Sequence, residues 1–309
     1  MWRRIGVTDG AAGSQAGAGP IPARGDARTV APPSHGPGFG SGANPQCIVG
    51  SMKAIGWNCR GAGRGLSSSK KMDYLAYLMS STRAQVIFIS ETRTSRYSSN
   101  QLNNHFNIED SIVVPSRGLS GGLWLLWTNE VQVDVNFVDH HVILASVFHI
   151  ATSVKFMLIF VYEDPHHRIT NMIWDPILTF VNNNLGSPVL CMGDLNDIMC
   201  EADTTSVNVN KYRIRAINDY VKQCGLFDLG FSGPAYTWTN KRFSSTPIFE
   251  RVDRCLANAE WCGMFPNTNV YNLPIILSDH APILDSTASQ FHRPKLKFKF
   301  ENKLPNRPG

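Results

Sequence analysis

Polar side chains follow short apolar runs at several widely separated places in this sequence. Asn58 ends one such run, Glu91 follows a second and Asp194 ends a third, while Asp253 and His280 lie further along the chain. Short apolar runs predict buried strands, and polar groups just beyond them collect at the rim of a sheet, where active sites form. Carboxylates, amides and one histidine gathered at a single rim suit a divalent cation and a phosphate ester.

The chemistry that such a set can perform is phosphodiester hydrolysis. This reaction needs a basic water, a cation on the non-bridging oxygens and relief of charge on the leaving oxygen. Glu91 is the first candidate for a metal ligand because Mg²⁺ prefers hard oxygen, and Asn58 is expected to orient it or to support the waters of the metal. Asp194 and Asn196 lie two apart, which points both side chains the same way on an extended or tightly turned segment; the alternative interpretation is an Asx-turn after a strand.

The hydrophobic pattern predicts the elements that would position these residues. Three consecutive strands with short links, at 131–137, 141–150 and 154–162, indicate antiparallel pairing. Apolar stripes predict helices at 69–80, 169–183 and 212–224, with Pro176 kinking the second or dividing it in two. Each half of the chain is predicted to contain a strand, a helix and a strand, with further antiparallel strands. Two facing sheets with helices on their outer sides would bury the apolar residues of both halves. Further strands are predicted at 53–57, 86–89, 112–115, 123–127, 189–193, 236–239, 251–257, 270–273 and 281–284.

Composition divides the chain of 309 residues into three parts. Residues 1–51 form a leader rich in Gly, Ala and Pro, which we expect to be disordered because it has few large apolar residues. Residues 52–288 form one domain, and residues 289–309 a basic polar tail. The net charge of +5 permits a polyanionic partner without requiring one. For each basic cluster, the alternative to a binding role is ordinary solvated surface charge.

The cysteine content and the apolar stretches indicate in which cellular compartment the protein is expected. Seven cysteines without a C-x-x-C pair argue against a zinc site or a disulfide framework and fit a reducing compartment. His149 and Lys155 interrupt the longest apolar stretch, so we expect no membrane span. The protein is therefore expected in the nucleus or cytoplasm. The leader also has some of the composition of an organelle transit peptide, and a true start at Met52 is a further interpretation.

Six short motifs, in this order, carry a family resemblance: Trp57–Gly61, Ser90–Thr92, Val161–Tyr162, Gly193–Asn196, Arg251–Arg254 and Ser278–His280. Together they resemble the endonuclease/exonuclease/phosphatase superfamily. The stretches Gly121–Trp127 and Cys224–Pro234 make the chain most similar to the endonuclease domains of plant LINE-type (non-LTR) retrotransposons. The resemblance covers about residues 52–284 and implies a DNase I-like four-layered α/β sandwich, with two facing mixed β-sheets flanked by helices. It further implies an endonuclease that nicks DNA and depends on Mg²⁺, with Mn²⁺ as a substitute.

The same resemblance assigns roles to individual residues. It implies that His280 faces the phosphate while Asp253 accepts its ring N–H, and that Asp194 takes the proton of the attacking water, which Asn196 holds. The hydroxyl of Tyr162 would touch the scissile phosphate, although a core tyrosine is the alternative. The implied metal residues are Glu91, Asn58 and Asp279. The implied DNA contacts are Arg60, Arg93, Trp238, Lys241, Arg242 and Arg254, although Trp238 could instead fill the core.

Departures from the family pattern leave alternatives open. Arg60 stands where abasic-site repair enzymes have an acid, which favours the retrotransposon branch, whereas residues 201–211 lack the loop common among plant relatives. The alternatives are a repair endonuclease, an inositol or lipid phosphatase, and an inactive retrotransposon remnant. No reverse transcriptase segment follows in this chain, and no obligate protein partner can be read from it.

Overall fold

The computed structural model describes residues 51–60, 69–94, 97–118, 120–166, 168–243 and 245–288. The predicted leader, apart from Ser51, and the whole predicted tail lie outside the described residues. The limits of the predicted domain therefore stay predictions. In the described part of the chain, no helix is long and apolar enough to cross a membrane.

The first sheet has six strands in the order β13-β14-β1-β2-β4-β3. β1 and β2 are parallel and joined by helix α1 (Ser69–Thr82), whereas every other neighbouring pair in this sheet is antiparallel. A parallel pair requires such a crossover, and the apolar stripe of α1 packs on the outer face of the sheet. The strands are β1 (Lys53–Asn58), β2 (Val86–Ser90), β3 (Asp110–Val114), β4 (Leu123–Trp127), β13 (Asn269–Asn272) and β14 (Ile283–Ser286).

The second sheet also has six strands, in the order β5-β6-β7-β8-β12-β9. The predicted meander forms its first three strands, and helix α3 (Thr170–Asn183) crosses from β7 to the parallel strand β8. α3 is one helix that contains Pro176, so of the two predicted alternatives the division into two helices is wrong. The strands are β5 (Val131–Val138), β6 (Val142–His149), β7 (Val154–Tyr162), β8 (Val189–Asp194), β9 (Phe227–Asp228) and β12 (Asp253–Ala257).

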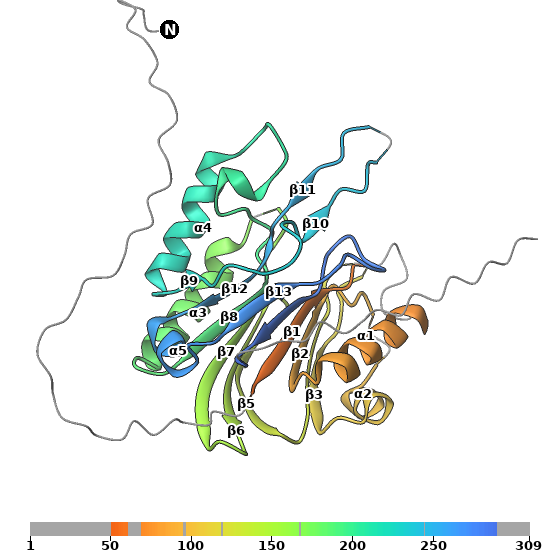
Figure 1. The fold of residues 1–309 in the computed structure, drawn as a ribbon, viewed down its shortest axis with the longest axis vertical. Helices are drawn as coiled ribbons and strands as arrows, with labels where there is room; N and C mark the ends of the chain where they lie inside the picture. Colours follow the sequence, from red (N-terminus) through yellow and green to blue (C-terminus); the bar gives the residue numbers. More distant parts are fainter. Residues whose placement is uncertain are drawn as a thin grey trace, which may run out of the picture. The chain divides into compact units, whose positions relative to one another are not determined.

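The two sheets face each other across an apolar core and carry helices on their outer faces (Figure 1). Alternate residues of β1, β2, β7 and β8 fill the space between the sheets. α3 and α4 (Lys211–Gln223) cover the second sheet, while α1 and α2 (Ser99–Phe106) cover the first. Both sheets are mixed and flanked by helices, which confirms the predicted DNase I-like sandwich. A short helix, α5 (Ala259–Met264), precedes β13.

One predicted symmetry is only partly present. The second half of the chain does not form the second sheet alone, because β13 and β14 return to the first sheet and β14 pairs with β1. The ends of the described domain consequently meet: the Met52 amide donates to Thr287 Oγ1 at 2.9 Å, and the Thr287 amide donates to the Met52 carbonyl at 3.0 Å.

One core position in β14 is a carboxylic acid. Asp285 is fully buried, and neither of its side-chain oxygens has a hydrogen-bond partner among the described residues. Its neighbours in the sheet are Ala54 and Val270. Burial raises the pKa of Asp285 to about 8, because a carboxylate in apolar surroundings loses its hydration.

Candidate active site

The parallel strand pairs bring four predicted site residues to one edge of the sandwich. β1 and β2 run in the same direction, so Asn58 at the end of β1 lies near Glu91, which follows β2. β7 and β8 likewise end together, at Tyr162 and Asp194. Asn58 Nδ2 donates to Asp194 Oδ2 at 2.8 Å, and this buried hydrogen bond joins the two sheets directly.

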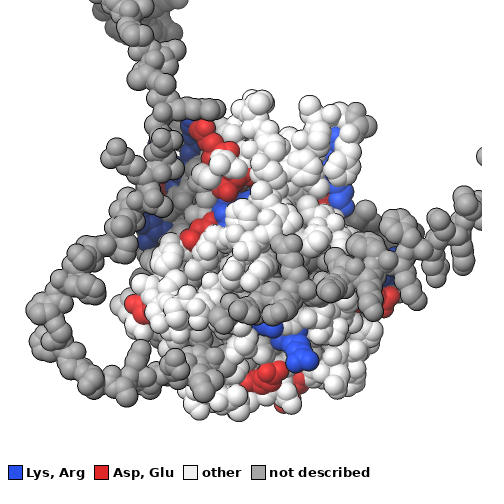
Figure 2. Space-filling model, viewed as in Figure 1, with Lys and Arg blue, Asp and Glu red and all other residues white. Residues whose placement is uncertain are grey.

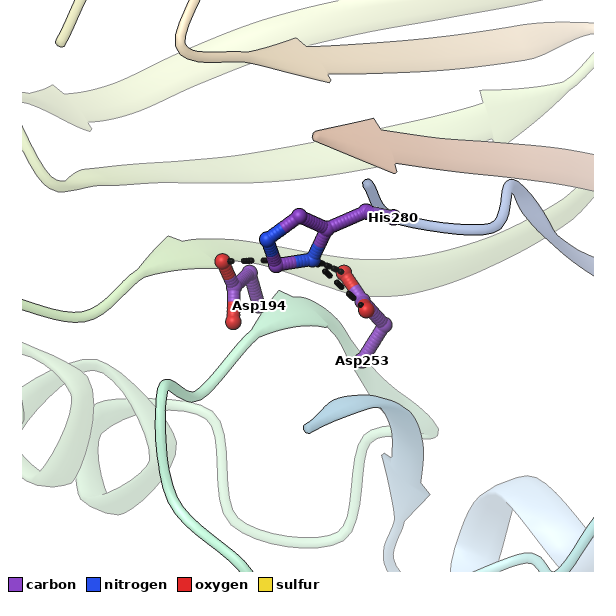
Figure 3. Close-up of side chains that lie close together, drawn as sticks. All are labelled: Asp194, Asp253 and His280. Carbon is purple, nitrogen blue, oxygen red and sulfur yellow. Dashed lines mark hydrogen bonds and ion pairs between the residues drawn. The ribbon is translucent and has the colours of Figure 1, made fainter. Parts of the chain in front are cut away.

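Asp253 and His280 lie beside Asp194 at this edge (Figure 3). Asp253 is opposite Asp194 in the antiparallel pair of β12 and β8. His280 Nδ1 is 3.0 Å from Asp253 Oδ2 and 3.3 Å from Asp253 Oδ1, and it is 3.8 Å from Asp194 Oδ2. The imidazole therefore lies between two carboxylates, and all three side chains are buried.

Burial and neighbouring charge shift the pKa values of two residues in this cluster. Burial alone would lower the pKa of His280, but the charges of Asp253 and Asp194 and the hydrogen bond to Asp253 outweigh it and raise this pKa to about 9. Burial raises the pKa of Asp194 to about 6, against the opposing effect of His280. Near pH 7 the cluster therefore holds an imidazolium next to a carboxylate whose pKa suits a general base.

Two residues that the sequence analysis did not single out hold this cluster in place. The Ser278 hydroxyl donates to the Asn58 carbonyl at 2.8 Å and accepts from the His280 amide at 3.1 Å. The Thr237 hydroxyl accepts from the Asp253 amide at 3.0 Å, while its carbonyl accepts from Ala281 at 2.7 Å. Ser278 stands inside a recognised motif, so that motif could have indicated it, whereas nothing in the local sequence marks Thr237.

Glu91 lies on the first-sheet side of the same edge. The Tyr162 hydroxyl donates to Glu91 Oε1 at 2.8 Å, and Arg93 Nε donates to Glu91 Oε2 at 3.0 Å. Burial, followed by the charge of Glu91, raises the pKa of Tyr162, so the phenol stays protonated and remains a donor. Glu91 and Arg93 both have left-handed backbones, with φ of 51° and 50°.

The turn at Gly121–Gly122 holds this strained segment. The amides of Thr92 and Arg93 donate to the carbonyls of Gly122 and Gly121 at 3.1 and 3.0 Å. A Cβ at Gly122 would lie 2.4 Å from Thr92 Oγ1, so only glycine allows the two segments to approach so closely. Backbone strain of this kind is typical of sites where a side chain must point in one direction.

The carboxylates of Glu91 and Asp279 form a pair that fits a divalent cation. The guanidinium of Arg60 lies 3.7 Å from Glu91 Oε2 and 3.4 Å from Asp279 Oδ2, so one positive group already bridges both carboxylates. Hard carboxylate oxygens are the ligands that Mg²⁺ prefers. These two residues are the ones that would hold the ion, whereas the Asn58 side chain donates to Asp194 and not to Glu91.

A second set of close ligand atoms is the triad of Asp194, Asp253 and His280, whose atoms lie within 4.8 Å of one another. Its carboxylates and imidazole are groups that can accept, hold and donate protons. In the metal-free protein, the raised pKa of His280 means that its ring carries a proton on each nitrogen near pH 7.

Asn196 and the segment after β7 fix the end of β8. The Asn196 amide donates to Asp194 Oδ1 at 2.9 Å, which is the Asx-turn considered above, while Asn196 Nδ2 donates to the Glu163 carbonyl at 2.7 Å. Glu163 is fully buried, accepts from Trp174 Nε1 at 2.9 Å, and burial raises its pKa to about 8. The sequence analysis missed Glu163 because it follows Tyr162 without any motif of its own.

The predicted DNA contacts separate into two groups. Arg60, Lys241 and Arg242 are exposed, whereas Arg93 and Trp238 are half-buried near the edge. Lys241 and Arg242 lie in the hairpin formed by β10 (Trp238–Thr239) and β11 (Phe249–Glu250). This hairpin projects beyond the sheets (Figure 1). The Trp238 ring lies 6.5 Å from that of His280. On the face drawn in Figure 2, Lys and Arg occur in separate places, not in one continuous surface.

Arg254 is a correction to the predicted DNA contacts. Its side chain is 1% exposed and pairs with Asp203, at 2.5 Å, and with Asp228. Arg251 also pairs with Asp228, at 2.7 Å. The alternation of β12 explains the error, because Asp253 and Arg254 point to opposite faces of one strand. Arg254 therefore holds β9 and the segment around Asp203 to β12 and cannot reach a nucleic acid.

Comparison with known proteins agrees with this geometry. The sequence model of the Endonuclease/Exonuclease/phosphatase family matches residues 55–280. No curated protein sequence matches the chain. Similar solved structures include the AP endonuclease LMAP from Leishmania major, with a TM-score of 0.59 and 15% identity over 76% of this chain and 87% of that one. The endonuclease domain of TRAS1, a telomere-specific non-LTR retrotransposon, has a TM-score of 0.55 and 13% identity over 76% and 97%. The 3′ phosphatase NExo from Neisseria has a TM-score of 0.54 and 17% identity over 76% and 98%.

Proposed function

The chain belongs to the endonuclease/exonuclease/phosphatase family of phosphodiesterases and nucleases, and on that premise we propose that it is a Mg²⁺-dependent endonuclease that nicks one strand of DNA. The observation that carries the proposal is the cluster of Asp194, Asp253 and His280 beside the carboxylates of Glu91 and Asp279. A nick that leaves a 3′-hydroxyl would, in an intact retrotransposon, prime reverse transcription. The fold shared with the TRAS1 endonuclease domain is consistent with this branch.

Each charged side chain has a task in the proposed reaction. Glu91 and Asp279 would hold a divalent cation, which would supply positive charge to the phosphate oxygens. Asp194, whose pKa is raised to about 6, is largely ionised at pH 7 and accepts the proton of the attacking water. Asn58 donates to the same carboxylate and fixes its direction.

His280 supplies the opposite charge. Its ring, held by Asp253 through Nδ1, faces the phosphate as an imidazolium and stabilises the charge that develops on the phosphoryl oxygens. Tyr162 and Arg93 hold Glu91 in place, and the Asn196 amide donates to Asp194 at the end of β8, where Asn196 would help to hold the water. The exposed hairpin residues Lys241 and Arg242 contact the phosphates of the flanking duplex.

The test is a supercoiled plasmid incubated with the purified full chain and a series of divalent metals. We expect conversion to the open circle with Mg²⁺ or Mn²⁺, no conversion with EDTA, and ends that a polymerase extends. His280→Ala should lose at least about a hundredfold in rate, which is within the range of a general acid–base or charge-stabilising group. His105→Ala, in the exposed face of α2, is the matched control.

Substrate preference separates this proposal from the other members of the family. The same protein is assayed on plain duplex, on duplex with an abasic site and on inositol phosphates. Faster cleavage of the abasic duplex would assign the chain to repair, and hydrolysis of inositol phosphates alone would assign it to the phosphatases. Equal nicking by wild type and His280→Ala would contradict the proposed site.

A further inference from the structure

Glu91, the first candidate for a metal ligand, already has a partner at each carboxylate oxygen. Oε1 accepts from the Tyr162 hydroxyl at 2.8 Å. Oε2 accepts from Arg93 Nε and Nη2 at 3.0 and 2.5 Å and lies 3.7 Å from Arg60 Nε. A cation that binds Glu91 must therefore displace or share at least one of these contacts.

The two arginines lie on the solvent side of the carboxylate. The side chain of Glu91 is 7% exposed, that of Arg93 is 21% exposed and that of Arg60 is 44% exposed. Arg60 also reaches Asp279, at 3.4 Å, so two guanidinium groups cover two carboxylates. This set of four charges is neutral as a whole, and it therefore attracts a divalent ion far less than two uncovered carboxylates would.

A phosphodiester offers these arginines the same kind of partner that Glu91 does. Guanidinium groups bind phosphate and carboxylate oxygens with the same two-pronged geometry. Arg60 is exposed at the edge where the proposed substrate lies, and Arg93 is half-buried just behind it. The phosphates of DNA bound at this edge would compete with the carboxylates of Glu91 and Asp279 for both guanidinium groups.

We propose that Arg60 and Arg93 form a latch that makes metal binding conditional on DNA. In the DNA-free protein the latch, defined as these two side chains, holds Glu91 and Asp279. The phosphates of bound DNA draw the guanidinium groups away and uncover the carboxylates for the ion. This inference rests on the proposed function and concerns how the same site is regulated.

Thermodynamic linkage makes the latch reciprocal. If DNA raises the affinity of the protein for the ion by a given factor, the ion raises the affinity for DNA by the same factor. Couplings of this kind are typically about 5–150-fold. Removal of either arginine should raise the affinity of the DNA-free protein for the ion and reduce the coupling.

The first experiment measures Mn²⁺ binding to the DNA-free full chain by titration calorimetry. Arg93→Met and Arg60→Met should each bind Mn²⁺ at least about fivefold more tightly than wild type, by the coupling range above. Arg117→Met, which removes an exposed arginine in the turn after β3, is the matched control for loss of one positive charge and should bind like wild type. Glu91→Gln should bind more weakly than wild type. Variants that bind no more tightly than wild type and Arg117→Met would overturn the latch.

The second experiment measures affinity for a fluorescent phosphorothioate duplex that resists hydrolysis, with and without Mn²⁺ at constant ionic strength. Wild type should gain at least about fivefold on addition of Mn²⁺, Arg93→Met should gain less, and Glu91→Gln should report only the counterion effect. Equal gains in wild type and Arg93→Met overturn the latch. If the latch fails while the plasmid is still nicked, the proposed function stands; if none of the proteins binds Mn²⁺ or nicks DNA, both proposals fall.

Discussion

At His280, burial and neighbouring charge act on one ring in opposite directions. Burial favours the neutral imidazole, and two carboxylates favour the imidazolium. The carboxylates prevail because they lie 3.0 Å and 3.8 Å from Nδ1 and all three side chains are buried, where charges interact more strongly than in water. The same environment raises the pKa of Asp194, so one small cluster supplies both a base and a cation near neutral pH.

The nicking rate should therefore have a bell-shaped dependence on pH. It should rise as Asp194 ionises around pH 6 and fall as His280 loses its proton around pH 9. Asp253→Asn removes the strongest influence that raises the pKa of His280, so the falling limb should move to lower pH. The charge of Asp253 also raises the pKa of Asp194, so the rising limb should move to lower pH as well. Plasmid nicking measured from pH 5 to pH 10 checks this. A falling limb that stays in place would contradict the role of Asp253.

The buried ion pairs of Arg254 should be essential for stability. Arg254→Met leaves Asp203 and Asp228 without this partner, and breaking a buried pair typically costs about 3–5 kcal/mol of unfolding free energy. Urea unfolding measures this loss. The matched control is Arg242→Met in the exposed hairpin, which should change the unfolding free energy by less than about 0.5 kcal/mol. Arg242→Met should weaken DNA binding and reduce its salt dependence, and an equal loss of stability in both variants would contradict the distinction.

At the scale of elements, the close approach of β7 and β8 depends on one glycine. Gly193 has φ of 145°, and a Cβ at this position would lie 1.9 Å from the Val161 carbonyl oxygen. It immediately precedes Asp194, so the backbone that allows this approach also sets the position of the proposed base.

Gly193→Ala should consequently lower the unfolding free energy by at least about 2 kcal/mol, since it combines backbone strain with a backbone clash. Gly263→Ala is the matched control, because Gly263 lies in α5 with nothing within 4 Å of the added Cβ. Alanine is the better helix former, so the control should be neutral or stabilising by less than about 1 kcal/mol. Thermal unfolding of both variants gives the comparison, and a tolerated Gly193→Ala would show that the strands can separate.

The sequence predicted well those strands whose hydrophobic pattern reflects burial, either on both faces of the strand or on one face only. The runs at β2, β4 and β8 are fully buried, and the meander alternates where β5 is exposed on one side. The hydrophobic pattern could not reveal which strands and side chains pair when they lie far apart in the sequence. β14 inserts between β13 and β1, and Arg254 turns inward toward Asp203 and Asp228, because tertiary pairing decides both.

The predicted site shows the same division. Motif residues such as Asn58, Asp194, Asp253 and His280 do converge, since each stands at a strand end or in a loop that the motif itself marks. Thr237 and Glu163 were missed because their contribution is a hydroxyl or a carbonyl offered to another segment. Such contacts leave no trace in composition or spacing.

At the scale of the whole molecule, the buried carboxyl of Asp285 should make stability depend on pH. Its pKa is raised to about 8 in the folded protein, whereas in the unfolded chain it ionises near its ordinary value of 3.8. Between these values the folded state binds more protons, so the unfolding free energy falls as pH rises, by at most about 1.4 kcal/mol per pH unit from this group. Above pH 8 its contribution levels off.

Asp285→Asn tests this directly, because asparagine has nearly the same shape and no charge to titrate. We expect the variant to be more stable than wild type at pH 8.5, with a smaller difference at pH 5. Urea unfolding at pH 5, 7 and 8.5 measures the change, and comparison with wild type cancels the titration of His280 and Asp194. A wild-type and variant pair with parallel pH profiles would show that Asp285 does not titrate in this range.

The meeting of Met52 with Thr287 has a consequence for how the protein is made. β1 is synthesised before every other described strand, yet its partner β14 and the loop that carries His280 emerge from the ribosome after the remaining described strands. A nascent chain therefore has an open sheet edge and lacks His280 until these segments are released. We expect a growing polypeptide to be harmless to nucleic acid, because the fold closes and the proposed reaction centre becomes complete in the same late step.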